Sequence, residues 1–436
     1  MFRGIKFVQL GLLLAIGVSL SGCHGGSSGS AAAVAYVRLA NATRNGNLAL
    51  ALNQNVTINN IMSNLVANVA AGVTPNSVSG YVPVTAGTYS STVTDVNGLL
   101  SSTVAVALGG TFYTVLVSER DGAIRQNVIV DSQVAPAGGF ASFNAQNFSI
   151  DAGALDIYVV PSSVTTPTNP CQDFCAVNYG SAVSPQLLVA GTYNVIVTAS
   201  GNQNDVRFTY PSLALSGGEM LTLALTGTSG GGLVNGVLVQ QGGPMQVVPA
   251  STARVRVVSG STSGTVSATV GTSTLLADVT SPSGSYTLVP ANSSISALTV
   301  NSVSINTLPP NIFTAGGDYT ILVYDSSGTP TAAVVTDLNQ TLGSDAVLRV
   351  VNAAVATASG VNLQYNLSSV ATKVLLGSSS GNVGVSPSNA SNIVISPSAI
   401  NCPPNDCTNV DLVSGGIYTY FVLNPSTPQV FVSKDR

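Results

Sequence analysis

Short runs in which apolar and polar residues alternate recur along the whole chain. Val, Thr and Tyr dominate these runs, and clusters of Gly, Asn or Ser separate them, as is typical of strands joined by turns. The clearest runs are residues 35–41, 91–94, 113–117, 155–160, 193–198, 254–258, 319–324 and 347–351. A loosely helical spacing at residues 58–71 is weakened by its Asn and Val residues. The pattern therefore predicts an all-β protein.

Three landmarks recur in the same order: an opening strand, a middle Ala-Gly-Thr-Tyr motif, and a Gly-Gly pair that leads into a strand. The opening strands are Tyr36–Ala42, Ala253–Ser259, Val347–Ala353 and a weaker copy at Phe140–Ala145. The middle motif is at Ala86–Tyr89 and Ala190–Tyr193, with a variant at Ser283–Tyr286. The Gly-Gly strands are Gly109–Val117, Gly217–Leu223, Gly316–Val323 and Gly415–Val422. Glycine permits the positive φ of a tight turn before such a strand.

These repeats divide the chain into four units at 34–135, 136–248, 249–341 and 342–436. Each unit has the size of an immunoglobulin-like sandwich, about 100 residues. We therefore expect tandem antiparallel immunoglobulin-like β-sandwich domains. The constant order of the landmarks argues against chance matches in a glycine-rich β protein.

The landmarks also resemble those of a bacterial family, the domain-of-unknown-function 4397 family. The resemblance rests on an opening strand with Arg followed by Asn-Ala, a middle Ala-Gly-Thr-Tyr and a late Gly-Gly-x-Tyr-Thr, and it spans nearly all of residues 34–434. It implies an antiparallel β-sandwich, tandem copies and an exported location, and it brings no catalytic residues. Unit 2 departs from the family pattern because its opening strand has no arginine, and unit 4 lacks the middle motif.

The N-terminus has the layout of an export signal over residues 1–22. Arg3 and Lys6 precede an uncharged apolar run at residues 10–20, which is too short to span a bilayer as a helix of about 20 residues. The run ends in Leu20-Ser-Gly-Cys23, which resembles the lipobox of bacterial lipoproteins. The resemblance implies cleavage before Cys23 and lipid on Cys23, with a membrane as partner. The alternative is an ordinary signal peptide whose cysteine lies there by chance.

Residues 23–33 would then form a lipidated, flexible Gly/Ser-rich tether. His24, rather than aspartate, follows Cys23. By resemblance to proteobacterial sorting rules, this residue favours the outer membrane, with the body facing either the periplasm or the cell surface.

Composition narrows the classes of function. Charged residues make up 7% of the chain and hydrophobic residues 45%, so the chain should fold and its polar surface should consist mostly of Ser, Thr, Asn and Gly. The net charge of −4 argues against nucleic acid as a partner.

Four cysteines besides Cys23 form two local pairs, Cys171 with Cys175 and Cys402 with Cys407. In an oxidising compartment each pair is expected to close a small disulfide loop. The alternative, a zinc site, lacks ligands because His24 is the chain's one histidine. We therefore expect neither a metal nor another cofactor.

Residues that could carry out catalysis are sparse. A histidine-dependent triad would need a histidine in the folded body, and His24 lies in the tether. A carboxylate pair for glycoside hydrolysis could come from the acidic residues Glu119, Asp151, Asp156, Asp173 and Glu219. Each of these also fits a turn or solvated position, and the run Gly230–Gly232 reads as a plain turn or linker.

Two hypotheses of function remain. In the first, the chain is a non-enzymatic envelope lipoprotein whose tandem sandwiches serve in binding, adhesion or envelope structure, with an envelope glycan or a protein as partner. In the second, it is an envelope hydrolase that uses a carboxylate pair on polysaccharide or peptide. The sparse titratable groups favour the first.

Overall fold

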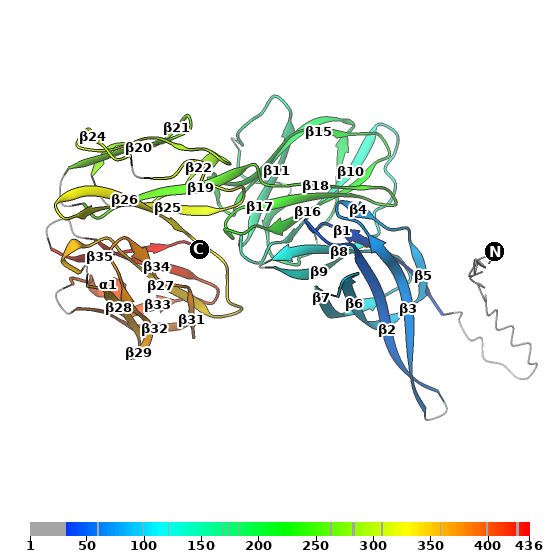
Figure 1. Cartoon of the computed structure of the whole chain (residues 1–436). Helices are drawn as coiled ribbons and strands as arrows, with labels where there is room; N and C mark the ends of the chain where they lie inside the picture. The colour runs from blue at the N-terminus through cyan, green and yellow to red at the C-terminus, as the bar shows by residue number, and fades with distance from the viewer. Residues whose placement is uncertain are drawn as a thin grey trace, which may run out of the picture.

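The computed structural model describes residues 32–436 except 59–60, 99, 121, 168, 173, 182, 262–263, 281–283, 307, 358, 398–399 and 424–426. The export signal, Cys23, His24 and Asp173 lie outside the described residues. Nearly all regular structure is β, apart from the short helical turns η1 (Val355–Thr357) and α1 (Pro404–Cys407) (Figure 1). In the part of the chain that the structure describes, no helix is long and apolar enough to cross a membrane.

The strands form four consecutive units, and each unit is a sandwich of two sheets around its own hydrophobic core. In unit 1 the first sheet has the order β4-β1-β8-β9, with β5 also paired to β1, and the second has the order β3-β2-β6-β7. The bounds are β1 (Val34–Asn41), β2 (Leu48–Ile58), β3 (Ile61–Val73), β4 (Ser77–Val78), β5 (Val82–Thr85), β6 (Gly87–Asp95), β7 (Ser101–Leu108), β8 (Phe112–Arg120) and β9 (Ala123–Asp131).

In unit 2 the sheets have the orders β13-β10-β16-β17-β18 and β12-β11-β14-β15. The bounds are β10 (Phe140–Phe148), β11 (Leu155–Pro161), β12 (Phe174–Val177), β13 (Gln186–Val189), β14 (Gly191–Ala199), β15 (Asn202–Leu215), β16 (Met220–Gly227), β17 (Val234–Gln240) and β18 (Met245–Val248).

In unit 3 the sheets have the orders β22-β19-β25-β26 and β21-β20-β23-β24. The bounds are β19 (Thr252–Ser259), β20 (Thr265–Val270), β21 (Ser273–Thr280), β22 (Thr287–Pro290), β23 (Ile295–Val300), β24 (Val303–Ser304), β25 (Asp318–Ser326) and β26 (Thr329–Thr336).

In unit 4 the sheets have the orders β30-β27-β34-β35, with β31 also paired to β27, and β29-β28-β32-β33. The bounds are β27 (Ala346–Asn352), β28 (Val361–Tyr365), β29 (Ser368–Val374), β30 (Ser378–Ser379), β31 (Val383–Val385), β32 (Ser388–Ser396), β33 (Thr408–Leu412), β34 (Ile417–Leu423) and β35 (Gln429–Lys434).

These sheets confirm the expected all-β fold of tandem sandwiches. Most strand pairs are antiparallel, but in every unit the opening strand lies parallel to the strand after the Gly-Gly pair. The parallel pairs are β1 with β8, β10 with β16, β19 with β25, and β27 with β34. This pairing places two of the sequence landmarks side by side, although they lie far apart in the chain.

The asparagine of the opening strand joins that strand to neighbouring loops. In unit 1 the Nδ2 of Asn41 donates to the backbone carbonyls of Gly46 at 3.0 Å and Val73 at 2.8 Å, and its Oδ1 accepts from the Thr43 amide at 3.0 Å. Equivalent bonds are made by Asn147 and Asn352. Because each asparagine is buried, these bonds satisfy backbone groups that water cannot reach.

The loosely helical segment at residues 58–71 is not a helix. Most of it is strand β3, which pairs with β2 over almost its whole length. Tertiary pairing therefore outweighs a weak local helical pattern. The β2–β3 hairpin extends beyond its sandwich at the blue end of the chain (Figure 1).

Candidate functional site

A buried arginine on the opening strand begins a chain of hydrogen bonds in units 1, 3 and 4. Its Nε donates to a threonine on the parallel strand, and the threonine hydroxyl donates to an aspartate at the end of the following strand. The three sets are Arg38–Thr114–Asp131, Arg256–Thr320–Asp337 and Arg349–Thr419–Asp435. We call each set an Arg–Thr–Asp chain. Parallel pairing puts the arginine and threonine directly opposite each other, so local geometry explains why these landmarks recur.

These arginines also reach across the joints between units. Arg38 of unit 1 donates to the carbonyls of Gln240 at 2.8 Å and Gly243 at 2.7 Å, in the β17–β18 turn of unit 2. In the second joint, Arg256 of unit 3 bonds to Asp435 of unit 4, and Arg349 of unit 4 lies 2.8 Å from Asp337 of unit 3.

Each of these joints also contains an apolar cluster between the two facing sheets. One cluster is Ala40, Leu116, Ile129, Ala224, Val237, Val239 and Met245. The other is Val258, Leu322, Val335, Val351, Ala353, Phe421 and Leu423. Unit 1 is thus packed on unit 2, and unit 3 on unit 4, as the arrangement in Figure 1 also shows.

A tyrosine covers the arginine in two of the chains. The Tyr81 ring lies 4.6 Å from the Arg38 guanidinium carbon, and its hydroxyl donates to Asp131 at 2.6 Å. Burial, and then the hydrogen bond to Asp131, raise the pKa of Tyr81 to about 12. Tyr286 has the same position in unit 3, 4.5 Å from Arg256 and bonded to Asp337 at 2.7 Å.

The position of Tyr286 changes one sequence assignment. Tyr89 and Tyr193 of the middle motif donate to the backbone carbonyls of Thr85 and Val189, whereas Tyr286 precedes β22 and covers an arginine as Tyr81 does. The structure therefore matches Tyr286 to Tyr81, and the likeness of Ser283–Tyr286 to the middle motif is only local.

The glycine run Gly230–Gly232, expected to be a plain turn or linker, packs tightly against unit 3. The Gly230 amide donates to the Gly316 carbonyl at 2.9 Å, and the Gly230 carbonyl accepts from the Asn339 amide at 2.9 Å. A Cβ on Gly231, whose φ is +86°, would lie 2.5 Å from the carbonyl carbon of Asn339. Unit 2 therefore meets unit 3 through close backbone contact that has no room for side chains.

A polar pocket of about 410 Å³ lies beside this contact, where units 2, 3 and 4 meet. Its lining includes Asp205, Arg207, Arg254, Lys434 and Asp435. Arg254 makes two bonds to Asp318, at 2.8 and 2.6 Å, and Arg207 bonds to Asp205 at 2.6 Å. Burial, and then the nearby Arg254, lower the pKa of Arg207. The charges in this pocket are largely matched by partners within the protein.

The candidate catalytic carboxylates hold turns and joints in different parts of the molecule. Asp151 accepts from Arg120 of unit 1 at 2.8 Å and from the Thr341 amide at 2.8 Å. Glu119 accepts from the Arg44 amide at 3.1 Å, and Glu219 from the Ser216 amide at 2.9 Å.

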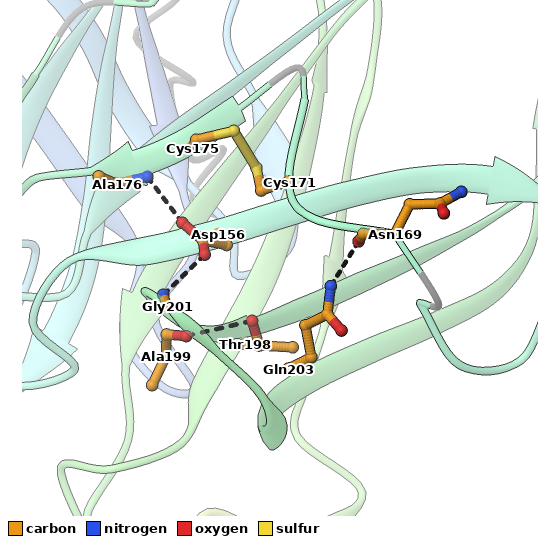
Figure 2. Close-up of a disulfide and its surroundings, with 9 residues drawn as sticks. All are labelled: Asp156, Asn169, Cys171, Cys175, Ala176, Thr198, Ala199, Gly201 and Gln203. Atoms are coloured by element: carbon orange, nitrogen blue, oxygen red, sulfur yellow. Dashed lines mark hydrogen bonds between the residues drawn. A yellow bond between two sulfur atoms is a disulfide. The ribbon is translucent and has the colours of Figure 1, made fainter.

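Asp156 lies beside the first disulfide and bonds to the residue that follows Cys175, as Figure 2 shows. Its two oxygens accept from the amides of Ala176 at 2.7 Å and Gly201 at 2.8 Å. The bond to Ala176 supports a residue whose φ is +47°, a conformation that costs energy in a residue with a side chain. No hydrogen bond of the described residues joins one of the four described candidate carboxylates to another.

Both expected cysteine pairs are disulfides in the structure. The Cα atoms of Cys171 and Cys175 are 5.5 Å apart, and those of Cys402 and Cys407 are 6.0 Å apart. The second disulfide encloses the short helix α1. Within the residues that the structure describes, no group of three or more His, Cys, Asp or Glu residues could hold a metal ion.

No curated protein matches this chain. Three solved structures show remote similarity. A leucine-rich repeat protein from Bacteroides thetaiotaomicron VPI-5482 is 16% identical over 43% of this chain and 25% of its own, with a TM-score of 0.13. The pilus adhesin SpaC from Lactobacillus rhamnosus GG is 11% identical over 70% of this chain and 43% of its own, with a TM-score of 0.14.

The TIE protein of Bacillus anthracis is 10% identical over 92% of this chain and 76% of its own, with a TM-score of 0.13. This chain covers about a quarter of the first of the three structures and less than half of the second. At such TM-scores these likenesses carry no argument about fold or function.

A family model gives the more informative match. The model described as Domain of unknown function (DUF4397) matches residues 35–158, which run from β1 of unit 1 into β11 of unit 2. The matched region contains the opening strand with Arg38, the middle motif at Tyr89 and the Gly-Gly strand with Thr114. Residues 35–158 of this chain thus match the family that the sequence landmarks predict, DUF4397.

Proposed function

We propose that this protein is a non-enzymatic, lipid-anchored scaffold of the bacterial envelope that serves in binding, adhesion or envelope structure. The proposal rests on one observation, the position of the buried ion pairs. In a chain with only 7% charged residues, ion pairs between arginines and buried aspartates link neighbouring sandwiches: Arg120 with Asp151, Arg256 with Asp435, and Arg349 with Asp337. Paired, buried charges of this kind specify how parts are arranged, which is the property that a scaffold needs.

The anchor in this proposal is lipid on Cys23, followed by the tether at residues 23–33. Val34, where β1 begins, lies eleven positions after Cys23. A fully extended tether of that length reaches at most about 40 Å, so the anchor would hold unit 1 close to the membrane. Two or three acyl chains on one cysteine are sufficient for stable attachment.

Replacing Cys23 with alanine should release the protein from the membrane fraction. We expect the natural chain, expressed in a bacterium with an outer membrane, to incorporate labelled palmitate and to sediment with membranes. The C23A variant should incorporate no label and should be soluble if exported. Ser28→Ala, five residues further along the tether, is the matched control and should behave as the natural chain does. Membrane attachment of C23A at the natural level would contradict the anchor.

A further inference from the structure

Unit 2 differs from the other units at two positions on the outer face of its opening strand. Asn144 lies opposite Thr222 in the parallel ladder, where Arg349 lies opposite Thr419 in unit 4. Two residues further along, Gln146 has the position of Val351. Unit 2 is therefore the unit that lacks an Arg–Thr–Asp chain, and it lacks one apolar residue of the joint as well.

These differences coincide with a cleft between units 1 and 2. In the joint between units 3 and 4, Arg349 reaches Asp337, and Val351 belongs to the apolar cluster. In the joint between units 1 and 2, a cleft of about 570 Å³ has Asn144 and Gln146 in its lining. Val128, Val130 and Gln133 contribute the unit 1 side of this cleft. The cleft lies on the same strand face that Arg349 and Val351 occupy in the other joint.

Both amide side chains have hydrogen-bonding groups without a described partner, although the two residues are nearly buried. Asn144 is 6% exposed and Gln146 is 9% exposed. The Oδ1 of Asn144 accepts from the Ala145 amide at 2.8 Å, but its Nδ2 donates to no described residue. The side-chain amide of Gln146 makes no hydrogen bond to any described residue. Neither amide is among the described side-chain atoms that are fully buried without a partner. Their unbonded groups therefore reach the open cleft, where a ligand can replace solvent as their hydrogen-bond partner.

The spacing of the polar groups matches an extended peptide. Ser142, Asn144 and Gln146 are alternate residues of β10 that line the cleft, so successive side chains are about 6.6 Å apart. An extended peptide repeats its outward-facing amide groups at the same interval. A side-chain amide offers one acceptor and two donor hydrogens, which can pair with backbone carbonyl and N–H groups.

The walls of the cleft define the side chains that it would accept. They combine polar residues with aliphatic ones, among them Val130, Val134 and Leu187, which are 47%, 85% and 65% exposed. None of the described lining residues is charged. The aromatic one, Phe148, packs against the apolar cluster between the two units, whereas a sugar site would be expected to present an open aromatic face. Aliphatic walls and unpaired amides favour a peptide over a glycan.

We propose that the cleft between units 1 and 2 binds an extended, uncharged polypeptide segment with aliphatic side chains. The proposal deepens the scaffold function and rests on its binding role, but it does not depend on the lipid anchor. It gives a role to the absence of an arginine at Asn144: the opening strand of unit 2 adds no guanidinium to the joint, and its outer face lines the cleft instead.

The test compares the natural cleft with a variant in which Asn144 and Gln146 are replaced by the residues at the equivalent positions of unit 4, so that the cleft is filled. Residues 24–436, which include all described residues, are immobilised and panned against a displayed library of random peptides of about ten residues. Peptides enriched on the natural sequence are then titrated against the variant N144R/Q146V by calorimetry. Asp131 has the position in unit 1 that Asp337 has in unit 3, so we expect the introduced guanidinium to pair with it as Arg349 pairs with Asp337, and the variant to fold. Asn389→Arg, at an exposed position of unit 4, controls for added charge.

We expect enriched peptides to be uncharged and rich in Val, Ile, Leu and Thr. Their Kd should rise at least about tenfold in N144R/Q146V, the loss expected from two hydrogen bonds and a filled cleft, and should stay the same in Asn389→Arg. Equal binding by the double variant would overturn the proposal, as would failure to enrich any peptide, or enrichment of charged peptides. Binding of neutral oligosaccharides in place of peptides would also overturn it. None of these results would affect membrane attachment, so the scaffold and its anchor are tested separately.

Discussion

Gly231→Ala should destabilise the joint between units 2 and 3 by about 3 kcal/mol. Two costs add here. The added methyl group would overlap the Asn339 backbone, and the φ of +86° is unfavourable for any residue with a Cβ. Because the Asn339 amide and Gly230 carbonyl are hydrogen-bonded at 2.9 Å, neither backbone can retreat without breaking a bond. Calorimetry should show a lower transition temperature for the variant.

Gly328→Ala separates the two costs. Gly328 lies in the β25–β26 turn with a φ of +81°, and a Cβ there would meet no atom within 4 Å. This variant should therefore lose only about 1 kcal/mol, from backbone strain alone. If the two variants lost the same stability, the close packing of the glycine run on unit 3 would not contribute to the joint.

Asp435→Ala should cost about 3–5 kcal/mol, because it removes one partner from a buried ionic cluster. Asp435 accepts from Arg256 and Arg349, which belong to different units, and from Thr419. Without this carboxylate both guanidinium groups would depend on Asp337. The loss should appear in calorimetry as weaker coupling between units 3 and 4. Asp411→Ala, at an exposed position on β33, should change stability little.

The same cluster predicts how stability depends on pH. Burial alone would raise the pKa of Asp435, but Arg256 and Arg349 outweigh it and hold the pKa at about 2. An aspartate in an unfolded chain has a pKa of about 3.9. Asp435 therefore adds stability above about pH 4, and this contribution is lost as the pH falls from about 4 through 2. The natural protein and D435A should thus converge in stability toward pH 2.

Sequence periodicity is sufficient to predict the all-β class and the tandem units, because alternation and turn residues are local signals. The opening-strand arginine and asparagine also stand out, since they recur at constant positions. The roles of these two residues cannot be predicted from the sequence, because each bonds to residues that are distant in the chain and come close only in the folded protein. Asn41, for example, holds a carbonyl 32 residues away at Val73.

The aspartates of the Arg–Thr–Asp chains are not among the residues predicted from the sequence, although the sequence carries a signal for them. Asp131 and Asp337 each follow their threonine by 17 residues, and Asp435 follows by 16. That interval is the length of a β-hairpin whose two strands bring the threonine and the aspartate together. An acidic residue at this distance from the threonine of Gly-Gly-x-Tyr-Thr therefore predicts the Thr–Asp hydrogen bond. The candidate catalytic carboxylates are instead predicted from their chemistry alone. The four that the structure describes hold turns or joints. Asp173 lies outside the described residues.

The role proposed for unit 2 could not be inferred from its sequence. The sequence shows that unit 2 lacks the arginine of the family pattern. The consequence of this difference can be seen only in the structure, where the arginines of the other units lie in the joints between units. The difference becomes clear only when Asn144 and Gln146 are compared with Arg349 and Val351, which have the equivalent positions in the joint between units 3 and 4.

In the proposed function, a lipid on Cys23 holds the scaffold at the bacterial membrane. The most direct test is the mass of the N-terminal peptide of the mature protein, extracted from membranes with detergent and digested with a protease. We expect a peptide that begins at Cys23 and carries the added mass of two or three acyl chains. A mature chain that begins elsewhere, or one whose Cys23 is free of lipid, would contradict the proposed anchor.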